Sequence, residues 1–402
     1  MTDVPTPAAP ARPRHWRRAT AALGLLAALA ASGWWWSGRE GSLATGLQLA
    51  STLLPEGMAL QTSGVQGSLR RGGRIDTLQW RQDGLHLQLQ VLELQLDMGR
   101  LWQGQLPLEH VRLGRLEGER QTAPTATAPI TQWVWPLPMA LVWQIDHLHW
   151  RNGTTLEASA LQGHYRFDGQ QHQLQLDHMQ WTQGHYSAQL QLQARAPMDL
   201  QVRLQGELTL PTERGTPHKL QAQASLQGPL AGPQARLALQ AQLSGTQPDA
   251  GPGATPDSAP QLALQGVLLP QATQPVSELQ AQLRQLDLAM LWPGAPQTQL
   301  DGHVQARPEA AGWRLEVDLR NRLTGAWDQG RIPLQQLQGQ LLHGASGWEL
   351  PTLLARWPGG GAQGAGRWQT GDWQGNWQIE RLQPGQWLKS LQGPALSGQV
   401  RA

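Results

Sequence analysis

Cysteine is absent from the 402 residues of this chain, which excludes disulfide bonds, thiolate zinc sites, iron–sulfur clusters and thiol nucleophiles. Charged residues are also scarce, at 15% against about 25% in typical soluble domains. The sequence contains no HExxH, GxSxG or Gly-Lys-Ser/Thr phosphate-binding motif. We therefore expect a protein that is not an enzyme and that holds no cofactor or metal.

Nucleic-acid binding is excluded by the distribution of charge. The chain has 31 Lys and Arg against 29 Asp and Glu, and its one dense group of basic residues lies within the first eighteen residues. A nucleic-acid partner would need a basic stripe on a folded domain. The remainder of the chain is close to neutral and offers none.

An uncharged stretch runs from Ala19 to Trp36, and as a helix it would be about 27 Å long, enough to cross a bilayer once. We expect a transmembrane signal-anchor at 19–36, with residues 1–18 as a cytoplasmic tail because positive charge favours the cytoplasmic side. The residues that determine this topology are Arg12, Arg14, Arg17, Arg18, Trp34, Trp35 and Trp36. A cleaved signal peptide ending near Ala30 and a buried soluble helix are the alternatives.

After the anchor the apolar period changes from helical to strand-like. Apolar residues at helical spacing from Leu43 to Leu54 predict a short helix that ends at Pro55. From Leu85 onward the alternation of leucine with Gln, His or charge predicts strands. The alternation slips by one residue between Val91 and Leu92, and there we expect a β-bulge.

Turn sequences indicate how these strands pair. The Asp-Gly and Asn-Gly pairs at 83–84, 152–153 and 168–169 separate strand-like runs and suit tight hairpins. Consecutive strands should therefore be antiparallel. The expected segments are 37–120, a linker at 121–131, 132–245, a second linker at 246–260, and 261–402.

The last segment contains a repeated phrase, Leu300-Asp-Gly-His-Val-Gln-Ala and Leu396-Ser-Gly-Gln-Val-Arg-Ala, separated by 96 residues. If the phrase begins a module, the chain ends at the first strand of another one. A strand edge left bare in this way would risk aggregation. The expectation is a truncated product, a fragment, or a subunit that meets a partner there.

Other motifs have less specific meanings. Histidines from His147 to His185 could supply metal ligands beside Asp168 and Asp177, although solvated faces explain them better. The GxGxxG match at 359–364 lacks a following amphipathic helix and is interpreted as a turn. The C-terminal tryptophans could stack on sugars or could fill a core.

Several phrases resemble TamB-type translocation and assembly module subunits, in the AsmA-like superfamily. They are the single anchor, the helix ending near Leu53-Leu54-Pro55-Glu-Gly57, the run from Val65-Gln-Gly67 to Trp80, and the phrases Leu101-Trp102-Gln-Gly104 and Leu319-Arg-Asn321 through Trp327-Asp328. The resemblance covers most of the chain. The C-terminal domain with which the family engages its outer-membrane β-barrel partner of the TamA type lies outside it.

The resemblance implies a mainly β fold, in which one N-terminal transmembrane helix precedes an elongated, curled antiparallel sheet that is open along one side and has few short helices. It places the body in the periplasm and implies phospholipid transfer along an apolar groove, or assistance to outer-membrane protein assembly. The candidate lipid-facing residues are Leu85, Leu87, Leu89, Leu190, Leu192, Leu200, Val202 and Leu204. A closed β-sandwich would show the same alternation, and a structural scaffold or a glycan-binding module are the alternative functions.

Overall fold

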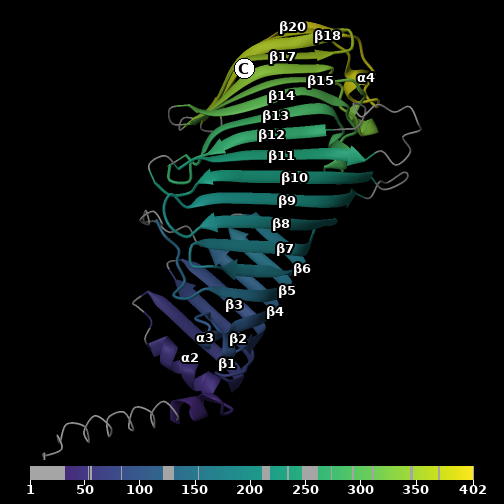
Figure 1. The fold of residues 1–402 in the computed structure, drawn as a ribbon. Helices are drawn as coiled ribbons and strands as arrows, with labels where there is room; N and C mark the ends of the chain where they lie inside the picture. Colours follow the sequence, from purple (N-terminus) through teal and green to yellow (C-terminus); the bar gives the residue numbers. More distant parts are fainter. Residues whose placement is uncertain are drawn as a thin grey trace, which may run out of the picture. The chain divides into compact units, whose positions relative to one another are not determined.

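The computed structural model describes residues 32–401 except 53, 55–56, 83, 121–130, 153, 211–217, 233–234, 247–260, 273, 292–293, 310–311, 345–346 and 370–371. The expected cytoplasmic tail, most of the expected anchor and nearly all of both expected linkers lie outside these residues. The chain divides into two compact units, one of residues 1–123 and 149–155, and one of residues 124–148 and 156–402. Figure 1 shows their elements.

The first unit is a small antiparallel sheet with a helix at its edge. Its elements are α2 (Ser42–Thr52), β1 (Met58–Ser68), β2 (Gly72–Gln82), β3 (Leu85–Leu96), α3 (Gly99–Trp102) and β4 (Leu108–Arg120). Each strand pairs antiparallel with the next. The helix predicted from Leu43 is confirmed as α2, which packs on β1. Its buried Ser42 accepts a hydrogen bond from the Leu69 amide at 3.1 Å.

The bulge predicted between Val91 and Leu92 is wrong. Ile75 faces Leu92 and Thr77 faces Gln90, so both strands advance by two residues and neither gains one. Val91 instead has a left-handed backbone, with φ 55°. The apolar alternation shifts at the same row in every strand of this sheet, so apolar residues stay opposite one another. Examples on either side of the row are Leu78, Leu89 and Leu116, and then Ile75, Leu92 and Leu113.

The second unit is a longer antiparallel sheet. The dividing line between the units passes through β5 (Met139–Asn152) and the start of β6 (Thr154–Phe167). The following strands are β7 (Gln171–Trp181), β8 (Gly184–Gln193), β9 (Asp199–Leu210), β10 (His218–Pro229), β11 (Leu237–Thr246), β12 (Gln261–Leu268), β13 (Val276–Leu286), β14 (Leu300–Glu309), β15 (Gly312–Asn321), β16 (Gln336–Gly344), β17 (Gly347–Trp357), β18 (Gly360–Gln369), β19 (Asp372–Leu382) and β20 (Leu396–Arg401). From β6 to β20 every strand pairs antiparallel with its successor, as predicted.

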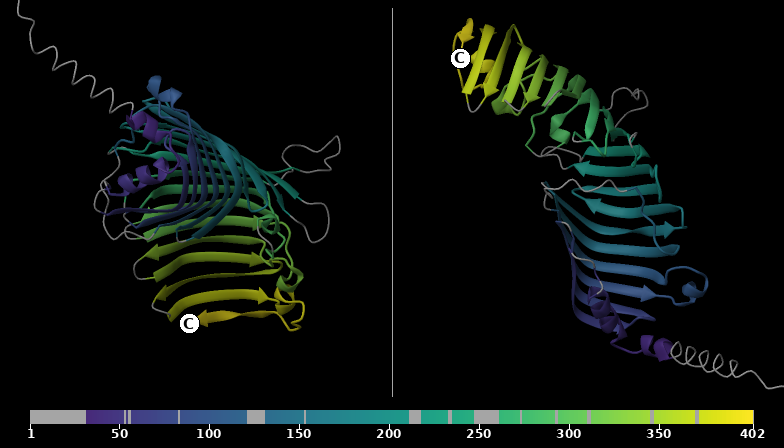
Figure 2. Two further views of the ribbon diagram at one scale, coloured as in Figure 1. Left: turned by 90° about the horizontal axis from the view of Figure 1, so that it is seen from below. Right: turned by 90° about the vertical axis from the view of Figure 1, so that its left-hand side faces the viewer.

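These sheets are curled and open, with no second layer over the described strands (Figure 2). Among the described residues, each strand contacts mainly its neighbours in the sheet, and the one helix with an extensive strand contact is α2. Besides α3, short helical turns of the described chain lie in connections between strands, as η2 (Leu288–Met290), η3 (Trp327–Gln329) and α4 (Pro384–Trp387). The closed sandwich is therefore not the fold of the described residues, because a sandwich needs two sheets face to face.

The repeated phrase occupies equivalent positions in β14 and β20. Gln285 and Arg381, which are 96 residues apart, both have φ 48°, and the strand register shifts at each of them. Their amides donate to the side chains at the second position of the phrase, Gln285 to Asp301 at 3.1 Å and Arg381 to Ser397 at 2.8 Å. In both copies of the phrase, the side chain at its second position thus accepts a hydrogen bond from the amide of a left-handed residue in the strand before it.

Candidate functional site: an apolar row across the second unit

One line of directly opposed residues crosses the second unit from β6 to β20 without a polar side chain. We call it the apolar row. Its members are Gly163, Leu176, Ala188, Leu204, Ala224, Ala241, Leu264, Ala281, Val304, Val317, Gly339, Leu353, Gly364, Trp377 and Val400. Successive strands are about 4.8 Å apart, so fourteen steps give a track of roughly 67 Å.

The apolar row is accessible to solvent. Every member from Leu176 to Trp377 is half-buried, and Val400 is exposed. A parallel row on the same strands is also apolar, and its members are Leu174, Leu190, Val202, Leu226, Leu239, Gly266, Leu279, Ala306, Leu315 and Leu341. Side chains that alternate along a strand point to opposite faces, so both rows lie on one face. That face is apolar and open along its length.

The opposite face of the same strands is polar. The residues between the two apolar rows are Gln175, Gln189, Arg203, Ser225, Gln240, Gln265, Gln280, Gln305, Glu316 and Gln340. Amide side chains interact along this face, as where Gln280 and Gln305 both donate to Glu278, at 2.8 and 2.9 Å. These hydrogen bonds lower the pKa of the Glu278 carboxyl, which stays ionised at neutral pH.

The structure places three of the predicted groove residues of the second unit in these rows: Leu190, Val202 and Leu204. The other two, Leu192 and Leu200, face each other and lie in neither row. Leu190 faces Val202 and Leu204 faces Ala188. Leu192 is only 5% exposed, because it packs in a small cluster with Met198 and Ala231. A bound chain therefore cannot contact Leu192 without displacing the segments that cover it.

In the first unit, the predicted residues Leu85, Leu87 and Leu89 are half-buried on β3. Leu87 faces Trp80 and Gly118 across the neighbouring strands. They form part of the apolar face of that sheet. Ile75 on β2 has no exposed surface, and it faces Val65 on β1 and Leu92 on β3.

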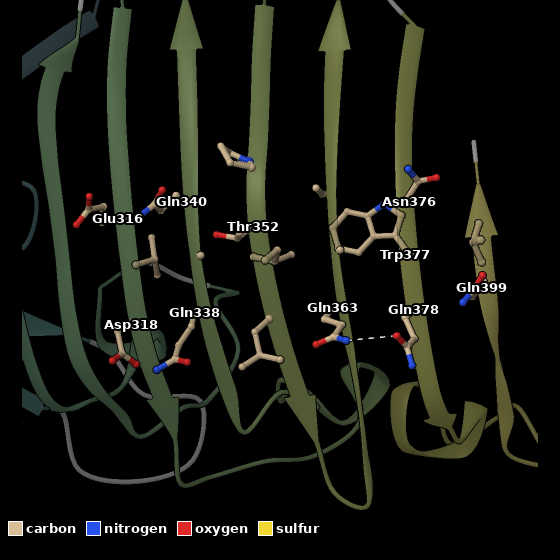
Figure 3. A pocket seen from close by; sticks show the side chains of 18 of the residues that line it. Glu316, Asp318, Gln338, Gln340, Thr352, Gln363, Asn376, Trp377, Gln378 and Gln399 are labelled. Atoms are coloured by element: carbon tan, nitrogen blue, oxygen red, sulfur yellow. Dashed lines mark hydrogen bonds between the residues drawn. The ribbon is translucent and has the colours of Figure 1, made fainter.

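A hollow of about 930 Å³ lies against strands β14–β20, and its lining includes residues of the apolar row such as Val317 and Trp377. Figure 3 shows polar side chains in two lines along it, one containing Glu316 and Gln340 and the other containing Asp318 and Gln338. Gln363 and Gln378 are hydrogen-bonded at 3.3 Å across neighbouring strands. These polar side chains offer hydrogen-bonding groups to water or to a hydrophilic ligand.

Comparison with known proteins adds no assignment. No family model, curated protein or solved structure matches this chain. The argument for function therefore rests on the geometry of the two faces.

Sequence reasoning did not identify most of the apolar row. The predicted set contained leucine and valine only, whereas the row also uses Ala224, Ala241, Gly339 and Gly364. Small residues in alternation with glutamine were the available signal. Which of them align across strands depends on register, and register is not visible within a single strand.

The C-terminal tryptophans separate into two groups. Trp348 faces Trp368, which faces Trp373, and all three are exposed, by 44%, 51% and 43%. Trp357 is instead 4% exposed and its indole donates to the Arg381 carbonyl at 3.2 Å. The first group forms an exposed aromatic surface on the sheet.

The histidines do not assemble a metal site in the described residues, where no group of three potential ligands converges. His164 contacts Asp177 at 2.8 Å and His178 stacks on His185. His172 is 1% exposed and hydrogen-bonds Tyr165 and the Trp133 carbonyl, each at 2.6 Å. Burial raises the pKa of Tyr165, so this phenol stays protonated and belongs to a packed polar cluster.

The predicted topology residues are only partly described. Arg12, Arg14, Arg17 and Arg18 lie outside the described residues, whereas Trp34, Trp35 and Trp36 are exposed by 44%, 63% and 38%. From residue 32 onward, no described helix combines the length and hydropathy needed to span a bilayer. The GxGxxG segment at 359–364 forms the turn after β17 and the first part of β18, with strand β18 following where a nucleotide site would need a helix.

Proposed function

We propose that this chain is a TamB-type protein, anchored in a bacterial inner membrane by residues 19–36, whose periplasmic body holds lipid acyl chains along the apolar row. In this role it supports outer-membrane biogenesis. The observation that carries the proposal is an apolar line that crosses fifteen strands, β6 to β20, while its members from Leu176 to Trp377 stay half-buried. A sheet stabilised only by its own core would cover such a line with a second layer.

The energetic argument is the cost of exposing this face to water. Each methylene sheltered from water contributes about 0.8 kcal/mol, so an acyl chain lying on an open face, shielded on one side, gains roughly half of that per methylene. Over a chain of ordinary lipid length this amounts to several kcal/mol, spread over several strands. Binding of this kind is strong enough to hold a lipid and weak enough to let it move along the row.

The resemblance of the sequence to TamB-type subunits supports the anchor, the periplasmic location and the cargo class. By resemblance alone, an outer-membrane β-barrel of the TamA type is the partner, and assistance to outer-membrane protein assembly is the related role. We assign the partner to no residue of this chain.

The test is site-specific photo-crosslinking in cells with the full chain. A photo-reactive amino acid replaces Leu264 in the apolar row or, as the matched control, its neighbour Gln265 on the opposite face. Mass spectrometry then detects phospholipid covalently attached to the protein. The proposal expects adducts at 264 and not at 265. Absence of adducts at 264 and also at Val304 and Val317 would contradict it.

Glycan binding is a second candidate function, favoured by the exposed line of Trp348, Trp368 and Trp373. Indole rings in a line offer faces on which sugar rings stack. Titration of peptidoglycan fragments against the full chain would change tryptophan emission in the parent and not in a Trp368→Ala variant. An unchanged emission in the parent removes this candidate.

A further inference from the structure

Two apolar side chains project from the connection between β3 and β4. Trp102 is 83% exposed and Leu101 is 39% exposed, and both lie on α3, a single helical turn. An indole left this far in solvent contributes little to the stability of the fold, because it removes little area from water. The stability of the fold therefore does not explain why this side chain is exposed.

The turn that presents Trp102 is held by several interactions. The Gly99 amide donates to the Asp97 carboxylate at 2.9 Å, and the Gln105 amide donates to the Arg100 carbonyl at 2.9 Å. Arg100 also forms an ion pair with Glu109 at 3.2 Å. The two apolar side chains therefore extend from a structured turn.

The fold brings this turn against a distant part of the sequence. The rings of Trp34 and Trp102 are 6.4 Å apart and inclined at 58°. With Trp35, Trp36 and Leu101 they form what we call the tryptophan patch. The patch joins the β3–β4 connection to the end of the uncharged stretch that begins at Ala19.

Positive charge accompanies the aromatic rings. The Arg70 guanidinium lies 4.0 Å from the centre of the Trp34 ring and donates to the Trp34 carbonyl. The Arg39 guanidinium lies 3.7 Å from the centre of the Trp35 ring. Indole rings beside cations are suited to the interface of a bilayer, where the ring meets the acyl boundary and the cation meets lipid phosphate.

We propose that the tryptophan patch is a second membrane contact, in which Leu101 and Trp102 insert into the phospholipid interface next to the end of the anchor. The inference rests on the proposed anchoring, because the uncharged stretch reaches the bilayer surface at Trp34 to Trp36. A single anchor leaves the attached unit free to rotate and tilt. A second contact, more than sixty residues further along the chain, fixes the orientation of the first unit on the membrane.

The absence of cysteine makes a direct test simple. Single cysteines replace Trp102, Trp35 or Trp327 in the full chain, carry a nitroxide label, and are reconstituted in vesicles of phosphatidylethanolamine and phosphatidylglycerol. Trp327 is the control, because it is 61% exposed on η3 of the second unit. Collision rates with apolar oxygen and with a water-soluble nickel complex then report the depth of each label.

The proposal expects labels at 35 and 102 to collide more with oxygen than with nickel, and the label at 327 to show the reverse. A label at 102 that behaves like the one at 327, while the label at 35 is membrane-embedded, overturns the inference and leaves the anchor intact. Aqueous labels at both 35 and 102 overturn the anchor and the inference together. A Leu101→Cys label provides the same measurement should the label at 102 disturb the turn.

Discussion

Leu264→Asp tests the proposed track at a single position. Leu264 is the one large side chain between Ala241 and Ala281 in the apolar row. Full burial of a leucine side chain is worth about 1.5–3 kcal/mol, and Leu264 is half-buried by the protein itself. A lipid that covers the remainder therefore gains about 1 kcal/mol from it, and a carboxylate in its place adds a desolvation cost.

The lost contact with lipid and the desolvation cost together correspond to roughly a tenfold loss of lipid occupancy, because about 1.4 kcal/mol changes an equilibrium tenfold. The assay is the yield of lipid adducts at a photo-reactive residue placed at Val304, two strands away in the same row. Gln265→Asp is the matched control, since it adds the same group one residue away on the opposite face. Circular dichroism of both variants verifies that the sheet is intact.

We expect the adduct yield to fall about tenfold in Leu264→Asp and to stay unchanged in Gln265→Asp. Equal yields in both variants would refute the assignment of the apolar face as the lipid track. An equal loss in both would attribute the effect to added charge, and would refute it as well.

Three further predictions concern stability. Ile75→Ala should lower the free energy of unfolding of the first unit by about 2–4 kcal/mol, because Ile75 is fully buried, whereas the exposed His86→Ala should change it by less than about 0.5 kcal/mol in the same urea titration. Asp301→Ala removes both the hydrogen bond to the Gln285 amide and an ion pair with Arg322 at 2.8 Å. It should lower the free energy of unfolding by about 1–2 kcal/mol, which is more than Ser397→Ala should cost at the equivalent position. Equal losses of stability in the two variants would contradict the role of the ion pair. Asp168 accepts backbone hydrogen bonds from Gln170 and Gln171, which lower its pKa. Its contribution to the free energy of unfolding should therefore be complete above the ordinary carboxyl pKa of about 4 and disappear as the pH falls through the lowered value. Thermal unfolding of Asp168→Asn and of the parent should show a difference at neutral pH that vanishes in acid.

The strand content and its connectivity followed from the sequence because they depend on local patterns. Alternation of leucine with glutamine marked strands such as β3, β8 and β9, and Asp168-Gly169 marked a hairpin, in which Gly169 has φ 100°. The helical spacing from Leu43 likewise predicted α2. The repeated phrase at Leu300 and Leu396 also proved to be local, since each copy caps a left-handed residue sixteen positions earlier.

Contacts between strands determine which residues share a row and which face is covered. Alternation assigns side chains to a face of one strand, but the register between strands determines the apolar row. For the same reason the sequence predicts a bulge between Val91 and Leu92, although the alternation shifts at one row in all four strands of the sheet. Burial of Leu192 depends on packing against Met198 and Ala231, which the alternation within its own strand does not reveal.

The strand period, the turns and the uncharged N-terminal stretch are readable in the sequence, because each depends on composition or on contacts between near neighbours. Whether the apolar face closes on a second layer depends on contacts between residues far apart in sequence, and the same alternation satisfies both outcomes. The fold left that face open along β6 to β20 and brought Trp102 to Trp34. Long-range packing thus decided the two surfaces to which we assign function.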